Sequence, residues 1–301
     1  MRRATARRSL ALLLGAGLLL VILPVVAEVS VDGPEGPHPA WLSMGLQGGE
    51  DDGFPVPWTV HRQSIPGWWV LNPEGDVRGD GHPAAAFAGG GFHPVVVWSR
   101  PVSGEGRDVV LSEWTGGGWS EPETVAGGVG EQRGPDVAAL PGGGVVVTWW
   151  EDDGNVRRVW VRKRGADGTW EDAEAVSPAG EDSRWPAVTV VEGEVYVGWL
   201  REVGDGTREV VVAREGAGWS REVIGETGYA GPEGEGNACL ELHAVGDRAW
   251  ADWRLAGDRI GTSRRESASG AWSDPEEIPC ENSPDGRRLA RWEAKRRALG
   301  W

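Results

Sequence analysis

The sequence has little of what many enzymes and metal proteins use for their chemistry. Its 301 residues include 2 Cys, 2 Tyr and 5 His. They contain no Gly-x-Ser-x-Gly elbow, no phosphate-binding loop and no His-Glu-x-x-His motif. Serine-hydrolase, nucleotide-binding and zinc-protease functions therefore have no support in the sequence.

The chain also lacks a basic surplus. Its formal net charge is −16, and residues 1–27 hold four Arg and no acid, so the remainder carries −20 once those four positive charges are removed. A body this acidic repels phosphate backbones, which argues against nucleic-acid binding. The charge favours solubility, with attraction of cations or basic partners as the alternative.

Residues 1–27 are expected to be a signal peptide. A basic start is followed by the apolar run LALLLGAGLLLVILPVV and by small residues before Glu28. The run is at the lower edge of membrane-spanning length, so an uncleaved anchor is the alternative. No later stretch is long and apolar enough to span a bilayer. We therefore expect a secreted or cell-envelope protein with no other membrane attachment.

The two cysteines, Cys239 and Cys280, are expected to form a disulfide in an oxidising compartment, with free buried thiols as the alternative. No His cluster accompanies them, so no metal site is expected. The acidic turns at Glu50–Gly53 and Glu151–Asn155 offer oxygen atoms that suit Ca²⁺, but neither has the full calcium-loop spacing. They are interpreted as solvated turns, and no cofactor is expected.

What the chain has in abundance is Gly, with 48 residues, and Trp, with 19, arranged in a repeat. The stretch 134–176, GPDVAALPGGGVVVTWWEDDGNVRRVWVRKRGADGTWEDAEAV, reads as four short strands separated by Gly-rich or acidic turns. Similar stretches occupy 82–125, 185–224 and 238–278. A four-stranded unit recurring at about 50 residues is typical of a β-propeller, in which each blade must stack on its neighbours.

Three columns of residues fix the register of these repeats. In each column, neighbouring members are 49 to 54 residues apart. One column opens the first strand, one closes the second, and one opens the fourth: Pro83, Pro135 and Pro186; Trp98, Trp149, Trp199 and Trp253; Trp119, Trp170, Trp219 and Trp272.

The sequence predicts an all-β fold, a β-propeller of five four-stranded blades over 54–280. Four repeats are complete, and the N-terminal strands around Trp69 supply a partial blade. Residues 28–53 form a Pro/Gly-rich acidic segment. The tail, 281–301, is expected to be a basic helix or a closing strand, since 286–301 has six basic residues and one acidic residue.

In a propeller, the loops between blades and the second-to-third turns share one end, which usually forms the binding site. We call this end the funnel face. The four loops between blades carry several polar or aromatic residues each: Arg78, Asp80 and His82; Glu131, Gln132 and Arg133; Asp182, Arg184 and Trp185; Glu226, Tyr229, Glu233, Glu235 and Asn237. The second-to-third turns end at regularly spaced arginines: Arg107, Arg157 and Arg208.

The pattern RGPDVAALPGGGVVVTWW…VWVRKRGADGTWEDAEAV resembles the sialidase-like propeller repeats, also called BNR-type repeats, over roughly 67–278. That family has a Ser-x-Asp-x-Gly-x-x-Trp turn, of which 166–170 is a shortened form. The family also has an Arg-x-Pro motif, whose spacing 133–135 and 184–186 match.

The resemblance implies candidate catalytic residues. A sialidase needs three convergent Arg for the substrate carboxylate, a Tyr nucleophile with an acidic partner, and an Asp acid/base. Arg78, Arg133 and Arg184 match the arginines. The nucleophile matches Tyr229 with Glu226 beside it, and Asp80 is the candidate acid.

Each of these positions has a structural alternative. The Arg residues recur with the repeat, so strand-end salt bridges between blades are the favoured interpretation. The Trp columns are interpreted as packing between blades. Tyr196 is expected in the core. Trp150 and Trp185 lie outside the columns and are the candidates for a ligand-stacking surface.

Two classes of function follow, with a third as a further alternative. The favoured one is a secreted, monomeric, non-catalytic propeller that binds a carbohydrate or an extracellular protein through its funnel face. The alternative is a sialidase-type exo-glycoside hydrolase. The third is a structural protein of the cell envelope.

Overall fold

The structure is a computed structural model that describes residues 28–33, 36–41, 81–88, 93–102, 106–152, 154, 156–228, 240–255, 259–265 and 270–279. These residues form strands and turns, with no helix among them. The predicted signal peptide, the partial N-terminal blade around Trp69, the tail and both cysteines lie outside the described residues.

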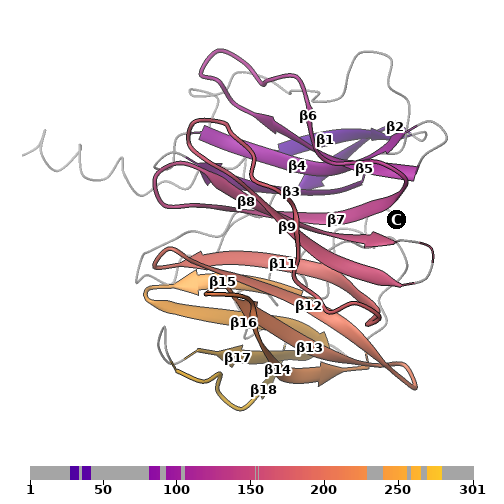
Figure 1. The fold of residues 1–301 in the computed structure, drawn as a ribbon, viewed down its shortest axis with the longest axis vertical. Helices are drawn as coiled ribbons and strands as arrows, with labels where there is room; N and C mark the ends of the chain where they lie inside the picture. The colour runs from indigo at the N-terminus through magenta and orange to yellow at the C-terminus, as the bar shows by residue number, and fades with distance from the viewer. Residues whose placement is uncertain are drawn as a thin grey trace, which may run out of the picture.

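Four antiparallel units follow one another along the chain (Figure 1). The first two units contain β3 (Gly81–Ala88), β4 (His93–Val102), β5 (Gly106–Glu113) and β6 (Glu123–Ala126), then β7 (Gly130–Ala139), β8 (Val145–Asp152), β9 (Arg157–Arg164) and β10 (Glu174–Ala175). The last two contain β11 (Ser183–Val191), β12 (Glu194–Gly204), β13 (Thr207–Arg214) and β14 (Ser220–Thr227), then β15 (Leu240–Val245), β16 (Arg248–Leu255), β17 (Arg259–Arg264) and β18 (Glu276–Pro279). A separate hairpin joins β1 (Glu28–Gly33) to β2 (Gly36–Trp41).

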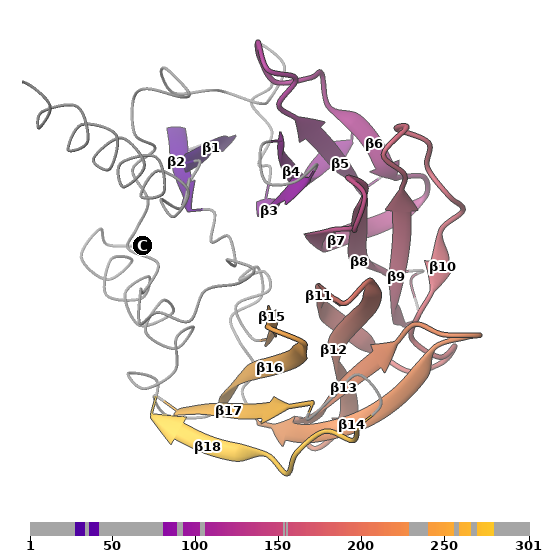
Figure 2. The ribbon, with the colours of Figure 1, turned by 90° about the vertical axis from the view of Figure 1, so that its left-hand side faces the viewer.

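The units are arranged around a common centre. The first strand of each unit, β3, β7, β11 and β15, lies innermost, and β6, β14 and β18 lie on the outside (Figure 2). Within a unit, each strand pairs with the next along the chain, and a short parallel pairing of β5 with β7 joins the first two units. This all-β arrangement agrees with the predicted fold class.

The seams between units hold the hydrophobic core. Strands are rich in Val because a branched side chain suits a pleated surface that is covered on both faces. Each of the three seams buries one cluster, built from both neighbouring units. The second-strand tryptophans are at most 2 % exposed, as the packing interpretation predicts: Trp98, Trp149, Trp199 and Trp253.

The first strands begin earlier than the sequence predicts. Pairing starts at Gly130 and Ser183, several residues before the prolines that were expected to open these strands. The reason is a β-bulge at each x-Pro step, where the register shifts between Arg133 and Asp136 and between Arg184 and Ala187. The bulge lets a strand continue past a proline that cannot donate a hydrogen bond.

The residue before each first-strand proline, Pro83, Pro135 and Pro186, has a left-handed backbone. Its φ is 55° at His82, 56° at Gly134 and 52° at Trp185. Glycine adopts this conformation without strain, whereas His and Trp do so at a cost of order 1–3 kcal/mol. His82 and Trp185 therefore sit in a conformation that the surrounding structure must hold.

One carboxylate links the innermost strands of the second and third units. The backbone N–H of Val188 donates to Oδ2 of Asp136 over 2.8 Å. We expect Asp136→Ala to lower the free energy of unfolding by about 1–2 kcal/mol, because it leaves a buried N–H without its acceptor. Asp136→Asn keeps an acceptor oxygen and should recover most of the loss in a urea titration. Equal midpoints for the Ala variant and the parent would contradict this role.

Candidate functional site

The funnel face is formed as the repeat predicts. Arg157, at the start of β9 in the second unit, lies 3.1 Å from a carboxylate oxygen of Asp182, which precedes β11 in the third unit. This contact brings a second-to-third turn and a connection between units to the same end of the molecule. The same end carries Arg133 and Arg184, from the starts of two first strands.

The arginines at the seam between the second and third units are bound to carboxylates. Arg208 is buried and places Nε 2.9 Å from Glu202. Arg184 places Nη2 3.5 Å from both Asp182 and Glu202. Arg157 lies 3.5 Å from Asp152 in addition to its contact with Asp182. Three guanidinium groups thus face three carboxylates, and the network is balanced in charge.

Trp185 lies inside this network. Its ring has Arg184 at 4.6 Å and Arg208 at 5.1 Å from the ring centroid, and its exposure is 7 %. It also belongs to the apolar cluster between the third and fourth units. The sequence predicts Trp185 as a ligand-stacking residue, but a sugar ring finds no open face on it here.

Burial lowers the pKa of Arg184, and the positive charge of Arg157 lowers it further. Arg208 adds to this effect, while Asp182 and Glu202 oppose it. Arg remains protonated at any physiological pH, so the shift measures how costly the buried charge is. The carboxylates are therefore needed to hold Arg184 in place.

Trp150 is half-buried on the same side of the molecule. Arg157 lies over its ring at 5.7 Å, and the ring packs against the apolar cluster between the second and third units. Each of the two tryptophans proposed for ligand stacking therefore already has an arginine against its ring. The contact between a guanidinium and an indole ring is a cation–π interaction.

Arg133 and His82 lie at the funnel-face end of the seam between the first and second units. Arg133 pairs with Glu131 on its own strand. Burial lowers the pKa of His82 from 6.5 to about 4, and the charges of Arg107 and Arg133 add to the effect. His82 is therefore neutral at neutral pH.

His82 should make the protein less stable in acid. Its folded-state pKa lies below its unfolded-state value, so the unfolded chain binds the proton more readily. Stability is then unaffected above about pH 6.5 and falls as the pH drops from there to about 4, by about 2 kcal/mol after allowance for solvent screening. His82→Asn, which tolerates a left-handed backbone, should flatten this part of the profile of unfolding free energy against pH. An unchanged profile would contradict the assignment.

The seam between the third and fourth units has a surface groove that the sequence did not indicate. Its volume is about 370 Å³. The third unit lines it with Thr207 and with Glu226 to Gly228, and the fourth unit with Leu255, Arg259 and Glu277. Glu226, proposed from the sequence as the acidic partner of the nucleophile, is exposed in this groove.

The remaining predicted site residues lie outside the described residues. They are Arg78, Asp80, Tyr229 and the two cysteines Cys239 and Cys280. Their roles stay predictions. Tyr196 is 1 % exposed, as predicted for a core residue, and its hydroxyl donates to Glu194 over 3.2 Å. Among the described residues, no three His, Cys, Asp or Glu side chains form a group that could hold a metal ion.

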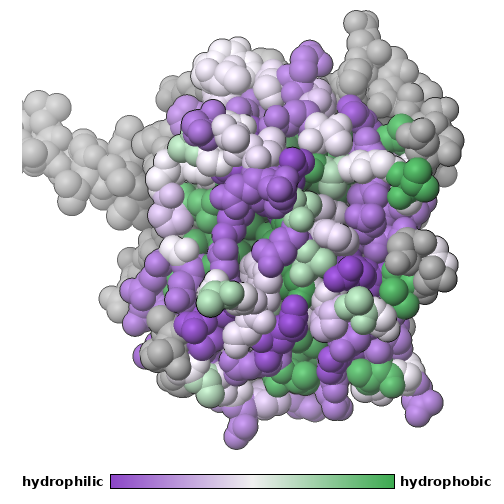
Figure 3. Space-filling view, viewed as in Figure 1, coloured by the Kyte–Doolittle hydropathy of each residue, from purple (hydrophilic) through white to green (hydrophobic). Residues whose placement is uncertain are grey.

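The surface is mostly polar. The face drawn in Figure 3 is dominated by hydrophilic residues, and hydrophobic residues show in small separate groups. The part of the chain that the structure describes contains no helix long and apolar enough to cross a membrane.

No protein-family model matches the chain, and no curated protein matches it. Solved structures do resemble it. A protein of unknown function from Dyadobacter fermentans matches with a TM-score of 0.48 and 12 % identity, over 66 % of this chain and 68 % of that one.

Two sialidase structures match at a similar level. A leech intramolecular trans-sialidase matches with a TM-score of 0.48 and 9 % identity over 68 % of this chain. A Streptococcus pneumoniae sialidase matches with a TM-score of 0.48 and 8 % identity over 70 % of this chain. The matches cover 51 % and 54 % of those chains, about half their length. Similarity at this level carries no argument about what this chain binds.

Proposed function

We propose that this chain is a secreted, monomeric, five-bladed β-propeller that binds a glycan at its funnel face without catalysing a reaction. One observation carries the proposal. Four arginines of the funnel face, Arg133, Arg157, Arg184 and Arg208, are paired with carboxylates of the chain, whereas the seam between the third and fourth units has an open groove lined with polar side chains. The ligand is therefore expected at this open groove.

The arrangement of the units supports the propeller. Four units surround one centre with their first strands innermost (Figure 2). A fifth blade, supplied by 54–80 and closed near the C-terminus, would continue the ring. The proposal that the protein is secreted rests on the sequence of residues 1–27 alone.

The ion pairs weigh against the sialidase alternative. A sialidase must offer guanidinium groups to the carboxylate of its substrate, and Arg suits that role because it binds a carboxylate with two hydrogen bonds. Here Glu131 holds Arg133, and Asp182 and Glu202 hold Arg184. A substrate carboxylate would have to displace carboxylates that are already in place.

A paired measurement on residues 28–301 tests the proposal: binding to an array of oligosaccharides and hydrolysis of a fluorogenic sialoside. We expect binding to a subset of the array and no hydrolysis. Hydrolysis that Tyr229→Phe abolishes would overturn the non-catalytic function and support the sialidase. If the protein bound no oligosaccharide on the array but captured a single extracellular protein, the glycan-binding function would be overturned and a protein ligand supported.

A further inference from the structure

The stack of four units has two end faces, and they differ in character. One belongs to the first unit and faces away from the second. It is apolar, with Val96, Trp98 and Val110 at most 1 % exposed, and none of the three belongs to the cluster between the first and second units. The other belongs to the fourth unit and faces away from the third (Figure 2). We call it the fourth-unit end face, and its side chains are mostly polar.

The polar character of the fourth-unit end face is a departure from the repeat. The column tryptophan of the second strand packs toward the preceding unit, so the residue before it points toward the next one. In the fourth unit this residue is Asp252, and Thr262 lies opposite it on β17. The first three units have mostly small or apolar residues at these two positions: Val97 and Leu111; Thr148 and Val161; Gly198 and Val212. A seam beyond the fourth unit is therefore not built from apolar side chains alone.

The fourth-unit end face is nevertheless shielded from water. Asp252 is 6 % exposed and Thr262 8 %, and Ile260, opposite Arg254 on the same face, is 1 % exposed. The apolar cluster that the fourth unit shares with the third lies against its other face. Burial to this extent requires a covering segment, and none of the four described units supplies it.

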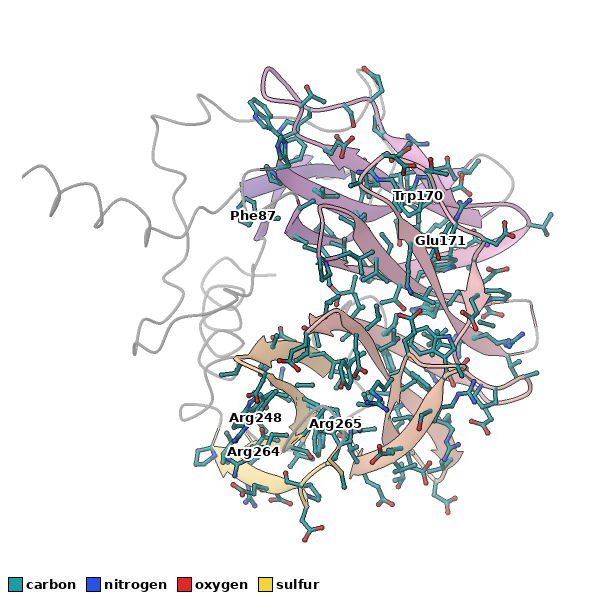
Figure 4. All side chains as sticks on the ribbon, turned by 60° about the vertical axis from the view of Figure 1, so that its left-hand side comes forward. Phe87, Trp170, Glu171, Arg248, Arg264 and Arg265 are labelled. Carbon is teal, nitrogen blue, oxygen red and sulfur yellow. The ribbon has the colours of Figure 1, made fainter. Side chains whose placement is uncertain are left out.

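The charges on the fourth-unit end face indicate what kind of segment covers it. By strand register, three acids lie on this face: Glu241, Asp252 and Glu276. We call them the end-face acids. Arg254 and Arg264 share the face, and Arg264, labelled in Figure 4, lies over the Trp250 ring at 5.5 Å. A buried carboxylate such as that of Asp252 is stable only when donors or cations meet it. A covering segment rich in Arg and Lys supplies both.

The second unit shows what an acid at one of these positions does. Asp136 holds the position of Glu241, since each lies opposite the residue that precedes the column tryptophan. Asp136 accepts a hydrogen bond from the backbone N–H of Val188 in the next unit over 2.8 Å. The same position in the fourth unit therefore directs an acid across the next seam.

Two segments of the chain adjoin the two end faces, and they differ as the faces do. Residues 54–80 precede the first unit and contain the apolar runs FPVPWTV and GWWVL. Residues 281–301 follow β18, the outermost strand of the fourth unit, and 286–301 hold six basic residues and one acidic residue. Residues 286–301 span about 24 Å as a helix or about 50 Å extended, whereas four paired strands are about 15 Å across. The tail is therefore long enough to cross the fourth-unit end face.

We propose that the tail, 281–301, docks on the fourth-unit end face and forms the last seam of the ring there. Its cations bind the end-face acids, and its apolar side chains cover Ile260. Residues 54–80 then lie against the apolar end face of the first unit. The tail is thus part of the folded body and not a basic arm that is free to bind a membrane or a partner. The inference does not depend on glycan binding.

The two lysines of the chain allow a direct test. They are Lys163 and Lys295. A carbodiimide joins a lysine amine to a carboxylate that it touches, without a spacer, and mass spectrometry of the peptides identifies the pair. Lys163 forms an ion pair with Glu215, so this link is the internal control. In residues 28–301 we expect that link together with a second one, from Lys295 to an end-face acid.

Conservative variants extend the test to other sides of the tail. Arg288→Lys, Arg291→Lys and Arg297→Lys each place an amine at a new position and keep the charge. We expect a link from the tail to an end-face acid in the parent or in at least one of these variants. An equal mixture of ¹⁵N-labelled and unlabelled protein shows whether the link lies within one copy of the chain.

Removal of charge from the face should loosen the tail. The double variant Glu241→Gln with Asp252→Asn keeps the shape of both side chains. Trypsin, which cuts after Arg and Lys, should remove the tail from it at least about threefold faster than from the parent. The matched control, Glu171→Gln with Glu174→Gln, removes two charges from an exposed segment of the second unit and should not change the rate. If the first double variant fails to fold, the cross-links of the parent decide.

The outcomes that contradict the inference are distinct. Formation of the Lys163–Glu215 link without any link from the tail to an end-face acid overturns the docking. Links from the tail to acids in 54–80 or in another unit overturn the place. Links that join only labelled to unlabelled chains assign the face to a second copy. Equal tryptic rates for the two double variants overturn the role of the acids. None of these results bears on the oligosaccharide array, which tests the proposed function separately.

Discussion

Replacement of Gly261 by Ala should lower the free energy of unfolding by about 3 kcal/mol. The ring of Trp253 lies against two glycines, Gly261 on β17 and Gly225 on β14 of the preceding unit. A methyl group at either position would fall well inside van der Waals contact with the ring. Trp253 is 2 % exposed and hydrogen-bonded to the third unit, so it has no room to move.

The control for this experiment is Gly117→Ala. A methyl group at Gly117 meets nothing within 4 Å, and the residue is exposed. Its free energy of unfolding should stay within about 0.5 kcal/mol of the parent in the same urea titration. If Gly261→Ala were as stable as Gly117→Ala, Trp253 would not be packed as described, and the seam between the third and fourth units would need another explanation.

Arg164→Ala should have the second-largest effect, a loss of about 2–3 kcal/mol. Arg164 ends β9 in the second unit, and its side chain is 9 % exposed. It pairs with Glu113 and Glu123, both in the first unit, and lies over the Trp170 ring at 5.6 Å. Breaking a fully buried ion pair costs 3–5 kcal/mol. The loss is smaller here because both carboxylates are more than a third exposed and can be rehydrated.

Two further variants show whether the effect depends on the seam. Arg164→Lys keeps the charge but cannot reach two carboxylates with a planar fork, so it should recover part of the stability. Arg248→Ala removes an arginine from the fourth unit (Figure 4), where the side chain is 43 % exposed and lies 3.9 Å from Asp247. It should change stability by less than about 0.5 kcal/mol. If Arg164→Ala and Arg248→Ala lost the same free energy of unfolding, Arg164 would not stabilise the stacking of the first and second units.

Much of the fold could be predicted because it repeats. The Pro and Trp columns fixed four units and their strand order before any contact was known. The repeat also placed Arg107, Arg157 and Arg208 on one face with the loops between units. What the columns could not predict is the bulge at each x-Pro step, because it depends on pairing beyond the proline and on left-handed backbone at His82, Gly134 and Trp185.

The candidate site was less predictable. Arg133 and Arg184 have spacings that fit a ligand as well as a salt bridge, and only the distances to Glu131, Asp182 and Glu202 distinguish the two. The groove between the third and fourth units could not be predicted for another reason. The residues that line it come from two units and belong to no repeated column of the sequence.

The central claim is that the funnel face binds its ligand at the open seam between the third and fourth units. Amide hydrogen exchange of residues 28–301, with and without a saturating concentration of an oligosaccharide that the protein binds on the array, tests it most directly. The account predicts added protection in the peptides that contain Thr227 and Arg259. It predicts no change in those that contain Arg133 and Arg184. Protection at Arg133 and Arg184 with none at Thr227 and Arg259 would contradict it.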